Sequence, residues 1–378
     1  MATTTRTCPP MTDVLTMLQN LVTRLFADEP GATLPTLGRE GAVWTLTGPH
    51  GTTAAGEPGP LVDLLVTQAT MAFLAANRGS LLLHSGAVAA DDGRSVLVCG
   101  RSGAGKTTLT AALARRGLAY LSDESVGVDP ASLTVTPWRK PLTVKPGSQG
   151  VLAELAPDAP DQLLTAPAWQ VEPRALGGLP LPAAQLHTTL IVLPSFDPAL
   201  DRVDVAPVTP ARAALALGQN SSALAAVRPR PLAALAALVS AVPTVLVRYP
   251  DAFLAAQTVH DLLLATPTDP TAEATEVADL PPLPDRSESA PGGLRRRPEV
   301  DTLVLDGEAV LFDGTRLHHL DAAATAVWSA LDGTLAPDAL AVDLARRYEA
   351  DPGQVRADVE SLIDAFTRAG LVEGPGLG

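Results

Sequence analysis

One segment of the chain combines glycines, a lysine and a hydroxyl side chain in the pattern of a phosphate-binding loop. Residues 100–107 read GRSGAGKT and fit the pattern G-x-x-x-x-G-K-[ST], with an apolar run before them and a helical pattern after them. The glycines let several main-chain N–H groups face one anion, and the helix N-terminus adds positive charge. The residues predicted to contact a nucleotide are Gly100, Arg101, Ser102, Gly103, Ala104, Gly105, Lys106, Thr107 and Thr108.

Two side chains of this loop have specific expected roles. Lys106 is predicted to reach the β- and γ-phosphates of a nucleoside triphosphate, and the Thr107 hydroxyl is predicted to ligate Mg²⁺. The alternative is an ordinary glycine-rich turn between a strand and a helix. The motif predicts a bound nucleotide but does not specify a reaction.

A pair of acids follows the next apolar run. The segment 118–126 reads LAYLSDESV and places Asp123 and Glu124 at a strand end close to the loop. In a transferase, one carboxylate could accept the proton of an acceptor hydroxyl while the other supports Mg²⁺. The alternative is that both acids cap a turn in solvent.

Other polar residues lie near these motifs. His84 follows an apolar run and is either a buried structural residue or a catalytic group. The segment RKPLTVKPGS carries Arg139, Lys140 and Lys145, which could neutralise phosphate or bind an acidic acceptor but fit a basic surface segment better. Lysine occurs only three times in the chain, which suggests that a compact ammonium is needed where it stands. Asp197 ends LIVLPSFD and is a more distant candidate for Mg²⁺.

The elements that must position these residues alternate between strands and helices. This alternation predicts an α/β fold, preceded by short strands and turns over 35–58. The predicted strands are 95–100, 118–121, 187–193 and 243–248, and the predicted helices are 61–76, 106–116, 210–218, 231–241 and 251–264.

A proline-rich segment divides the chain. Residues 267–298 contain seven prolines and no apolar periodicity, so we predict an extended, mobile linker whose basic end, 295–297, is solvated. The predicted organisation is an N-terminal strand and helix region at 1–79, an α/β domain at 80–266, the linker, and a small domain at 299–375.

The small domain has the order βββααα. Asp306-Gly307 and Asp313-Gly314 predict two hairpins joining strands at 302–305, 308–312 and 315–320. Asp321 and Asp351 are predicted N-caps of the first and third helices, and Tyr348 is predicted on the apolar face of the second.

Composition limits the class of protein. The 378 residues are 46% apolar, which allows a sizeable core in two or three domains. A net charge of −14 disfavours nucleic acids and anionic membranes as partners, and no apolar run is long enough for a transmembrane helix. Two cysteines, Cys8 and Cys99, exclude a disulfide framework. Because the first residues also lack a secretory apolar core, we expect a cytoplasmic protein.

The stretch LLLHSGAVAADDGRSVLVCGRSGAGKTTLTAALARRGLAYLSDESV resembles the core of the HPr kinase/phosphorylase-like family. The resemblance extends over about 80–265 and implies a P-loop kinase that uses ATP and Mg²⁺, leaving GTP and a homo-oligomer open. It implies that Asp123 is the base, assisted by His84 and Glu124. The chain departs from the family at Thr108, where HPr kinases have Glu, at Glu124, where Asp is usual, and in lacking a later Arg-containing signature. These departures point away from HPr itself and towards relatives in peptide natural-product pathways.

Residues 299–373 resemble PqqD-like domains, also called RiPP recognition elements. The likeness rests on the three strands, LDAAATAVWSALDG and the three-helix winged arrangement ending in AFTRAGLVE. It implies binding of a precursor leader peptide, which adds as a strand to 315–320 and packs against 352–369. A winged helix could instead read DNA, but residues 299–378 carry 15 acids against five arginines, and such a charge repels a duplex.

The sequence thus predicts a kinase that phosphorylates a Ser or Thr hydroxyl of a ribosomally made peptide recruited by its C-terminal domain. Two alternatives remain: a nucleotide-binding peptide scaffold without phosphotransfer, and a kinase of small hydroxyl compounds. The scaffold and the kinase are distinguished by whether the peptide gains phosphate.

Overall fold

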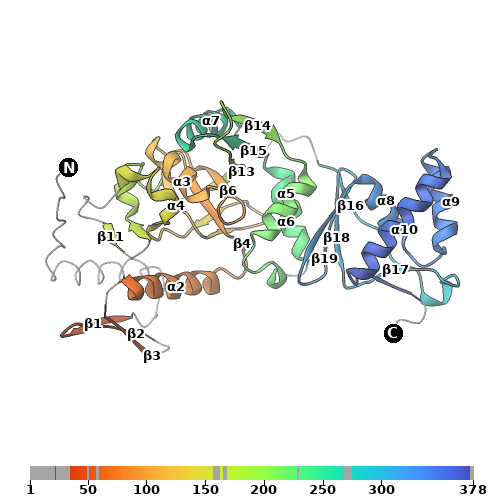
Figure 1. The fold of residues 1–378 in the computed structure, drawn as a ribbon, viewed down its shortest axis with the longest axis horizontal. Helices are drawn as coiled ribbons and strands as arrows, with labels where there is room; N and C mark the ends of the chain where they lie inside the picture. The colour runs from red at the N-terminus through yellow and green to blue at the C-terminus, as the bar shows by residue number, and fades with distance from the viewer. Residues whose placement is uncertain are drawn as a thin grey trace. The chain divides into compact units, whose positions relative to one another are not determined.

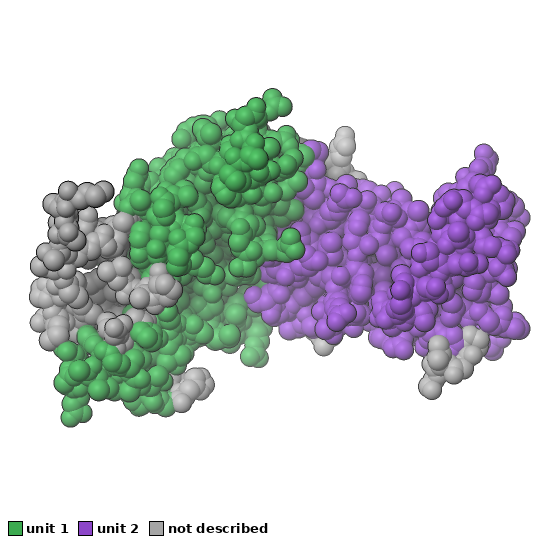
Figure 2. Space-filling view, viewed as in Figure 1, with its two compact units in different colours: residues 1–206, 245–268 green, residues 207–244, 269–378 purple. Residues whose placement is uncertain are grey.

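The computed structural model describes residues 22, 35–48, 51–56, 59–155, 162–164, 168–227, 230–267 and 275–374. Cys8, most of the predicted N-terminal region before residue 35, and residue 375 of the small domain lie outside the described residues. The chain divides into two compact units (Figure 2). Unit 1 contains residues 1–206 and 245–268, and unit 2 contains residues 207–244 and 269–378.

A six-stranded sheet with the order β14-β15-β13-β6-β5-β7 forms the centre of unit 1 (Figure 1). Its strands are β5 (Ser85–Ala89), β6 (Arg94–Cys99), β7 (Ala119–Ser122), β13 (His187–Phe196), β14 (Asp204–Pro207) and β15 (Thr244–Tyr249). Strand β5 is antiparallel to both β6 and β7, and β13 is parallel to β6. Strands β6 and β7 therefore run in the same direction and end at the same edge of the sheet.

Two helices pack together on this sheet. Helix α3 (Lys106–Arg115) and helix α7 (Ala252–Ala265) share one core with alternate residues of the strands. Val96 and Val98 of β6, Leu109 of α3 and Val259 of α7 belong to that core and are fully buried. The near-continuous apolar run of β6 is typical of a strand covered on both faces.

The remaining elements of unit 1 surround the sheet. They are helices α2 (Gly59–Ala76) and α4 (Pro146–Gln149), the short 3-10 turns η1 (Ala153–Leu155) and η2 (Pro173–Leu176), and three small sheets. The first small sheet contains β1 (Thr36–Glu40), β2 (Val43–Gly48) and β3 (Gly51–Ala55), the second β4 (Leu81–Leu83), β8 (Val126–Val128) and β9 (Val135–Pro137), and the third β10 (Leu142–Val144), β12 (Trp169–Val171) and β11 (Gln162–Leu164).

The predicted strands and helices of the α/β region are confirmed to within three residues at each end. In the sheet, β5 lies between β6 and β7. The portion of the chain that the structure describes has no helix that is both long and apolar enough to cross a membrane.

Unit 2 is built on a four-stranded sheet with the order β16-β18-β19-β20. Its strands are β16 (Val277–Ala278), β18 (Asp301–Leu305), β19 (Glu308–Phe312) and β20 (Leu317–Leu320), and β17 (Arg295–Arg296) pairs separately with β21 (Val372–Glu373). Its helices are α5 (Pro210–Gln219), α6 (Pro231–Ala241), α8 (Ala322–Ala330), α9 (Pro337–Arg347) and α10 (Pro352–Arg368), with turns η3 (Leu224–Ala226) and η4 (Arg286–Glu288).

Helices cover both faces of this sheet (Figure 1). Helices α8, α9 and α10 share a core with one face, in which Trp328 and Phe366 meet edge to face. Helices α5 and α6 pack on the strands as well: a Cβ added to Gly218 of α5 would lie 2.5 Å from Leu317 Cδ1 of β20. Residues 207–244 therefore lie in unit 2, whereas the sequence predicted them within an uninterrupted domain at 80–266.

The predicted turns and caps of the small domain are present. Asp306 and Gly307 both have positive φ and join β18 to β19, and the carboxylates of Asp321 and Asp351 accept main-chain N–H groups as N-caps. Two details were wrong. The third strand begins at Leu317 rather than residue 315, because the Asp313 carboxylate accepts the N–H groups of residues 315 and 316 in a turn. Tyr348 follows the end of α9 and is 60% exposed instead of lying on its apolar face.

The predicted mobile linker was wrong over its described residues, 275–298. Strand β16 pairs with β18, β17 pairs with β21, and the expected solvated end contains a buried residue, Arg296. The Arg296 guanidinium donates to the carbonyls of Trp328 and Pro281, each at 3.1 Å, and of Ser329. Residues 268–274 of the predicted linker lie outside the described residues.

Replacing Arg296 with Met is expected to lower the free energy of unfolding of unit 2 by about 1–3 kcal/mol, because buried carbonyls lose their donor. The neighbouring Arg297→Met is the control, since the Arg297 side chain is 43% exposed and its ion-pair partner among the described residues is Glu299 at 3.7 Å. Denaturant titrations of both variants measure the difference. Equal stability of the two variants would contradict the structural role of Arg296.

Candidate functional site

The glycine-rich loop, residues 100–105, leads from the end of β6 into α3. Gly103 and Gly105 have φ angles of 84° and 94°, which favour glycine. A Cβ on Gly105 would lie 2.3 Å from the Tyr249 hydroxyl, so this glycine is also required by close packing. The Lys106 ammonium donates to the carbonyls of Gly100, at 2.5 Å, and Arg101, at 3.3 Å.

The sheet brings three separate segments to one edge. Strands β6 and β7 end there, and β5, which runs in the opposite direction, begins there. Ser85 of β5 lies opposite Cys99 of β6. The Ser85 N–H donates to the Glu124 carbonyl at 3.1 Å. His84, the glycine-rich loop and the acid pair are therefore neighbours. Strand β5 lies between β6 and β7, and the acids still lie at the edge where β6 ends.

A cavity of about 720 Å³ lies at this edge. All four predicted catalytic residues line it, namely His84, Lys106, Asp123 and Glu124. Of the predicted nucleotide-binding residues, Ser102, Gly103, Gly105, Lys106, Thr107 and Thr108 line it, whereas Gly100, Arg101 and Ala104 do not. Thr107 and Glu124, the two predicted metal ligands, face the same space.

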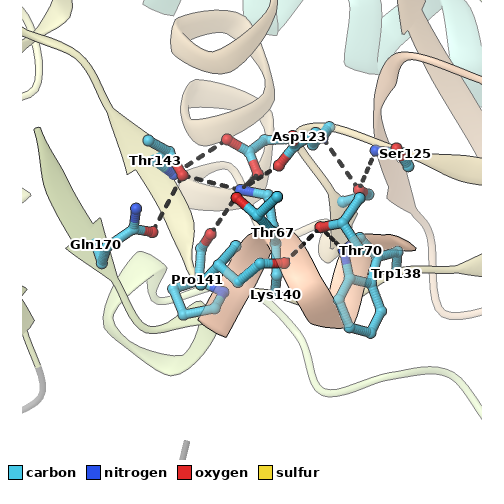
Figure 3. Close-up of polar contacts among 12 residues, drawn as sticks. Thr67, Thr70, Asp123, Ser125, Trp138, Lys140, Pro141, Thr143 and Gln170 are labelled. Atoms are coloured by element: carbon cyan, nitrogen blue, oxygen red, sulfur yellow. Dashed lines mark hydrogen bonds and ion pairs between the residues drawn. The ribbon is translucent and has the colours of Figure 1, made fainter. Parts of the chain in front are cut away.

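Asp123 is fixed by three donors, of which Lys140 and Thr143 are labelled in Figure 3. Its Oδ1 accepts from Lys140 Nζ at 2.7 Å and from the Tyr120 hydroxyl at 2.9 Å, and its Oδ2 accepts from the Thr143 N–H at 3.1 Å. Burial and the Asp123 carboxylate raise the pKa of Tyr120 well above its usual value, so the phenol remains a donor. The second lone pair of Oδ2 is therefore the position at which Asp123 can accept a further proton.

Lys140 is the centre of this network, and its assignment to a surface segment was wrong. The side chain is 1% exposed, and its ammonium also donates to the Pro141 carbonyl at 3.0 Å and to Thr143 Oγ1 at 2.9 Å. Glu124 Oε2 lies 3.2 Å from the same ammonium. Burial opposes the charge of Lys140, but Asp123 and Glu124 outweigh it and raise its pKa.

Glu124 and His84 are more accessible than Asp123. The Glu124 side chain is 39% exposed, and Lys140 is its ion-pair partner. The turn that carries it is held by Ser122 Oγ, which accepts from the N–H groups of Glu124 and Ser125. Burial and the nearby Lys106 lower the pKa of His84, so its imidazole is uncharged at neutral pH. Asp123 is therefore buried rather than a solvated turn acid, Glu124 is partly exposed in its turn, and His84 is exposed rather than part of the core.

Two other sequence candidates lie away from the cavity lining. Asp197 pairs with Arg248 at 3.5 Å, and the Arg139 guanidinium donates to the Tyr120 carbonyl at 3.0 Å. The described residues contain no group of three or more His, Cys, Asp or Glu side chains that could hold a metal by themselves. Mg²⁺ is usually held by one or two side chains together with substrate phosphates, and Thr107 and Glu124 fit that mode.

Sequence reasoning missed several residues that line or support the cavity. Thr143 donates its N–H to Asp123, and its hydroxyl donates to Gln170 at 3.1 Å. Tyr249, at the end of β15, presents a buried hydroxyl without a hydrogen-bond partner among the described residues to the glycine-rich loop, and burial raises its pKa to about 12. The rarity of lysine was the one signal in the sequence that pointed to the segment containing Lys140 and Thr143.

In unit 2, β20 is an end strand of its sheet and pairs, among the described strands, with β19. Its two histidines have different partners: His318 meets Asp313 at 3.3 Å, and His319 meets Glu308 at 3.2 Å. Glu308 also accepts from Thr209, at the start of α5, at 2.8 Å. The predicted peptide-binding strand is therefore anchored by side chains on both faces, with its outer edge free of other described strands.

Comparison with known proteins identifies a segment of unit 2. Residues 308–372 match the family described as coenzyme PQQ synthesis protein D (PqqD), so this segment is a PqqD-like domain. The chain also matches a solved structure titled "TbiB1 in Complex with the TbiA(beta) Leader Peptide" with 26% sequence identity. The match covers 22% of this chain and 98% of that chain, and its TM-score is 0.20. A search among curated proteins gave no match. The family match begins at β19 and ends within β21, so the glycine-rich loop and the acid pair lie outside it.

Proposed function

We propose that the chain is an ATP- and Mg²⁺-dependent kinase that phosphorylates a Ser or Thr hydroxyl of a ribosomally made peptide. The observation that supports it most is the meeting of the glycine-rich loop, Lys106, His84 and the two acids around one cavity. The cavity volume of about 720 Å³ lies within the range of small-molecule sites. We assign the loop of residues 100–107 to the triphosphate, as a P-loop in an HPr kinase-like unit.

The residues present fit the proposed ligands. Gly103 and Gly105 allow the main chain to curl around an anion, and the Tyr249 hydroxyl beside Gly105 lacks a partner among the described residues. Thr107 and Glu124 would hold Mg²⁺, which offsets phosphate charge when it is bound. Lys106 would contact the β- and γ-phosphates.

Asp123 is the proposed base. The acceptor hydroxyl oxygen forms a bond to the γ-phosphorus, the bond from that phosphorus to the bridging oxygen breaks, and ADP leaves with the electron pair. The hydroxyl proton passes to Asp123 Oδ2, because Oδ1 already accepts two donors. Lys140, Tyr120 and the Thr143 N–H hold the carboxylate in place, and His84 and Glu124 assist from the cavity wall.

The PqqD-like domain is the proposed recruiting element, because domains of this kind bind precursor leader peptides. The leader would add as a strand to the outer edge of β20 and lie against α10. The chain passes between the two units at three places, near residues 206, 244 and 268, so the recruiting element is not attached by a single tether. Removing residues 299–378 would uncover α5 and α6, and such a truncation therefore cannot test recruitment cleanly.

Hydrogen exchange tests the docking surface without truncation. The probe is a candidate precursor peptide taken from a short open reading frame next to the gene. Its binding is expected to slow amide exchange in Leu317–Leu320 and Pro352–Arg368. The opposite edge strand of the same sheet, Val277–Ala278, is the internal control and should not change. Protection confined to that opposite edge would place the peptide elsewhere.

The proposed reaction is tested by mass spectrometry of the same precursor after incubation with the full chain, ATP and Mg²⁺. We expect a gain of one phosphate on a Ser or Thr residue. An unchanged peptide in a mixture where nucleotide is bound would favour the scaffold function, to which the replacement of the family's Glu by Thr108 also points. Phosphate on a small hydroxyl compound instead of the peptide would favour the third function.

A further inference from the structure

All three lysines of the 378-residue chain line one cavity. Lys106, Lys140 and Lys145 come from different regions of unit 1: the start of α3, the segment before β10 and the segment after it. The other basic positions of the chain, apart from histidines, are arginines. Every lysine side chain of the protein therefore lines this cavity.

The three ammonium groups have different surroundings. Lys140 is buried and bonded to Asp123, Thr143 and the Pro141 carbonyl, so it has no donor left for a ligand. Among the described residues, the hydrogen-bond acceptors of Lys106 are carbonyls of its own loop. Lys145 is exposed towards the cavity, and no described residue forms an ion pair or side-chain hydrogen bond with its ammonium.

Asp63, Asp123, Glu124 and Asp251 line the cavity, and three of these four acids have partners other than Lys106 and Lys145. Asp123 and Glu124 pair with Lys140, and Asp251 accepts the N–H groups of Phe253 and Leu254 as the N-cap of α7. Burial lowers the pKa of Lys106, and repulsion from Lys145 lowers it further. Two like charges that face one space are stabilised when an anion lies between them.

Lys145 is held in place from both sides of the cavity. On one side, β10 places Thr143 so that its N–H reaches Asp123 Oδ2 at 3.1 Å. On the other side, the Ser148 N–H donates to the Lys145 carbonyl at 2.9 Å, and Ser148 Oγ accepts from Thr108 Oγ1 at 3.0 Å. The main chain at Lys145 therefore connects a segment bonded to the proposed base with a segment bonded to the first turn of α3.

We infer that Lys145 is a second cationic contact for the terminal phosphoryl group of a bound nucleoside triphosphate. The inference rests on the proposed function. The terminal phosphoryl is the portion of the nucleotide that must lie between the glycine-rich loop and Asp123, and Lys145 lines the same cavity as both. In the transfer, the Lys145 ammonium offsets charge on the non-bridging oxygens and gives up no proton, while the acceptor proton goes to Asp123.

The test compares two nucleotides that differ in the terminal phosphate. Displacement of a fluorescent ADP from the full chain by ADP or by the non-hydrolysable ATP analogue AMP-PNP, with Mg²⁺ present, gives both affinities. Lys145→Met is expected to weaken AMP-PNP about 10- to 100-fold, the loss of a charge-assisted hydrogen bond, and to leave ADP within about threefold. Lys145→Arg should recover some of the affinity for AMP-PNP.

Two further variants make the outcome unambiguous. Lys106→Met should weaken both nucleotides, and Arg115→Met, on the same helix but exposed and outside the cavity lining, should change neither. Equal effects of Lys145→Met on ADP and AMP-PNP, or no effect on either, would overturn the inference while leaving the proposed function intact. Failure of the unaltered chain to bind any nucleotide would overturn the proposed function, and the inference with it.

Discussion

Asp123→Asn is expected to lower the rate of phosphoryl transfer about 10²- to 10⁴-fold while nucleotide binding remains. The amide keeps the size of the carboxylate and one oxygen acceptor, but it cannot take the hydroxyl proton. Single-turnover transfer to the precursor peptide measures the loss, and displacement of fluorescent ADP measures binding in the same preparation.

Asp197→Asn is the matched control for this variant. Asp197 follows the end of β13 in the same sheet, pairs with Arg248 and does not line the cavity. Its replacement should leave the transfer rate within about twofold, since surface ion pairs contribute little. Transfer at the unaltered rate by the Asp123 variant would show that the base is another group, with Glu124 the next candidate in the cavity wall.

The second large effect concerns stability. Lys140→Met is expected to lower the free energy of unfolding of unit 1 by about 3–5 kcal/mol, because Asp123 is 6% exposed and would lose its charged partner. Arg115→Met removes an exposed ion pair with Glu154 and should cost less than about 1 kcal/mol. Denaturant titrations followed by circular dichroism measure both.

The pH dependence of this effect has a definite sign. The folded-state pKa of Lys140 is raised, so its stabilising contribution is complete below the ordinary lysine pKa of about 10.4 and is lost only as pH rises through the folded value. The difference between the unaltered chain and Lys140→Met should therefore stay constant between about pH 6 and 9. A penalty of less than about 1 kcal/mol in that range would contradict the buried network.

The features of the fold that local sequence determines were predicted. The apolar run of β6, the glycine-rich loop and α3 follow one another in the chain, and the loop motif defines its own context. The caps at Asp321 and Asp351 are likewise local signals. The acid pair was predicted because it follows a strand that ends at the same sheet edge as β6.

The features that depend on distant partners were not predicted. The segment around Lys140 has the composition of a basic surface turn, and its burial depends on Asp123, 17 residues earlier, and on Thr143, whose hydroxyl meets Gln170, 27 residues later. Arg296 lies near the end of a proline-rich segment, and its guanidinium donates to the carbonyls of Trp328 and Ser329, which are 32 and 33 residues later in the chain. Helical periodicity predicted α5 and α6, but it does not specify the sheet on which they pack.

The central claim, that the loop of residues 100–107 binds a triphosphate, is tested most directly by calorimetric titration of ATP with Mg²⁺ into the unaltered chain and into Lys106→Ala. We predict saturable binding of one ATP per chain, which Lys106→Ala abolishes or strongly weakens. No heat of binding with ATP or GTP in the unaltered chain, or equal affinity in both proteins, would contradict the claim.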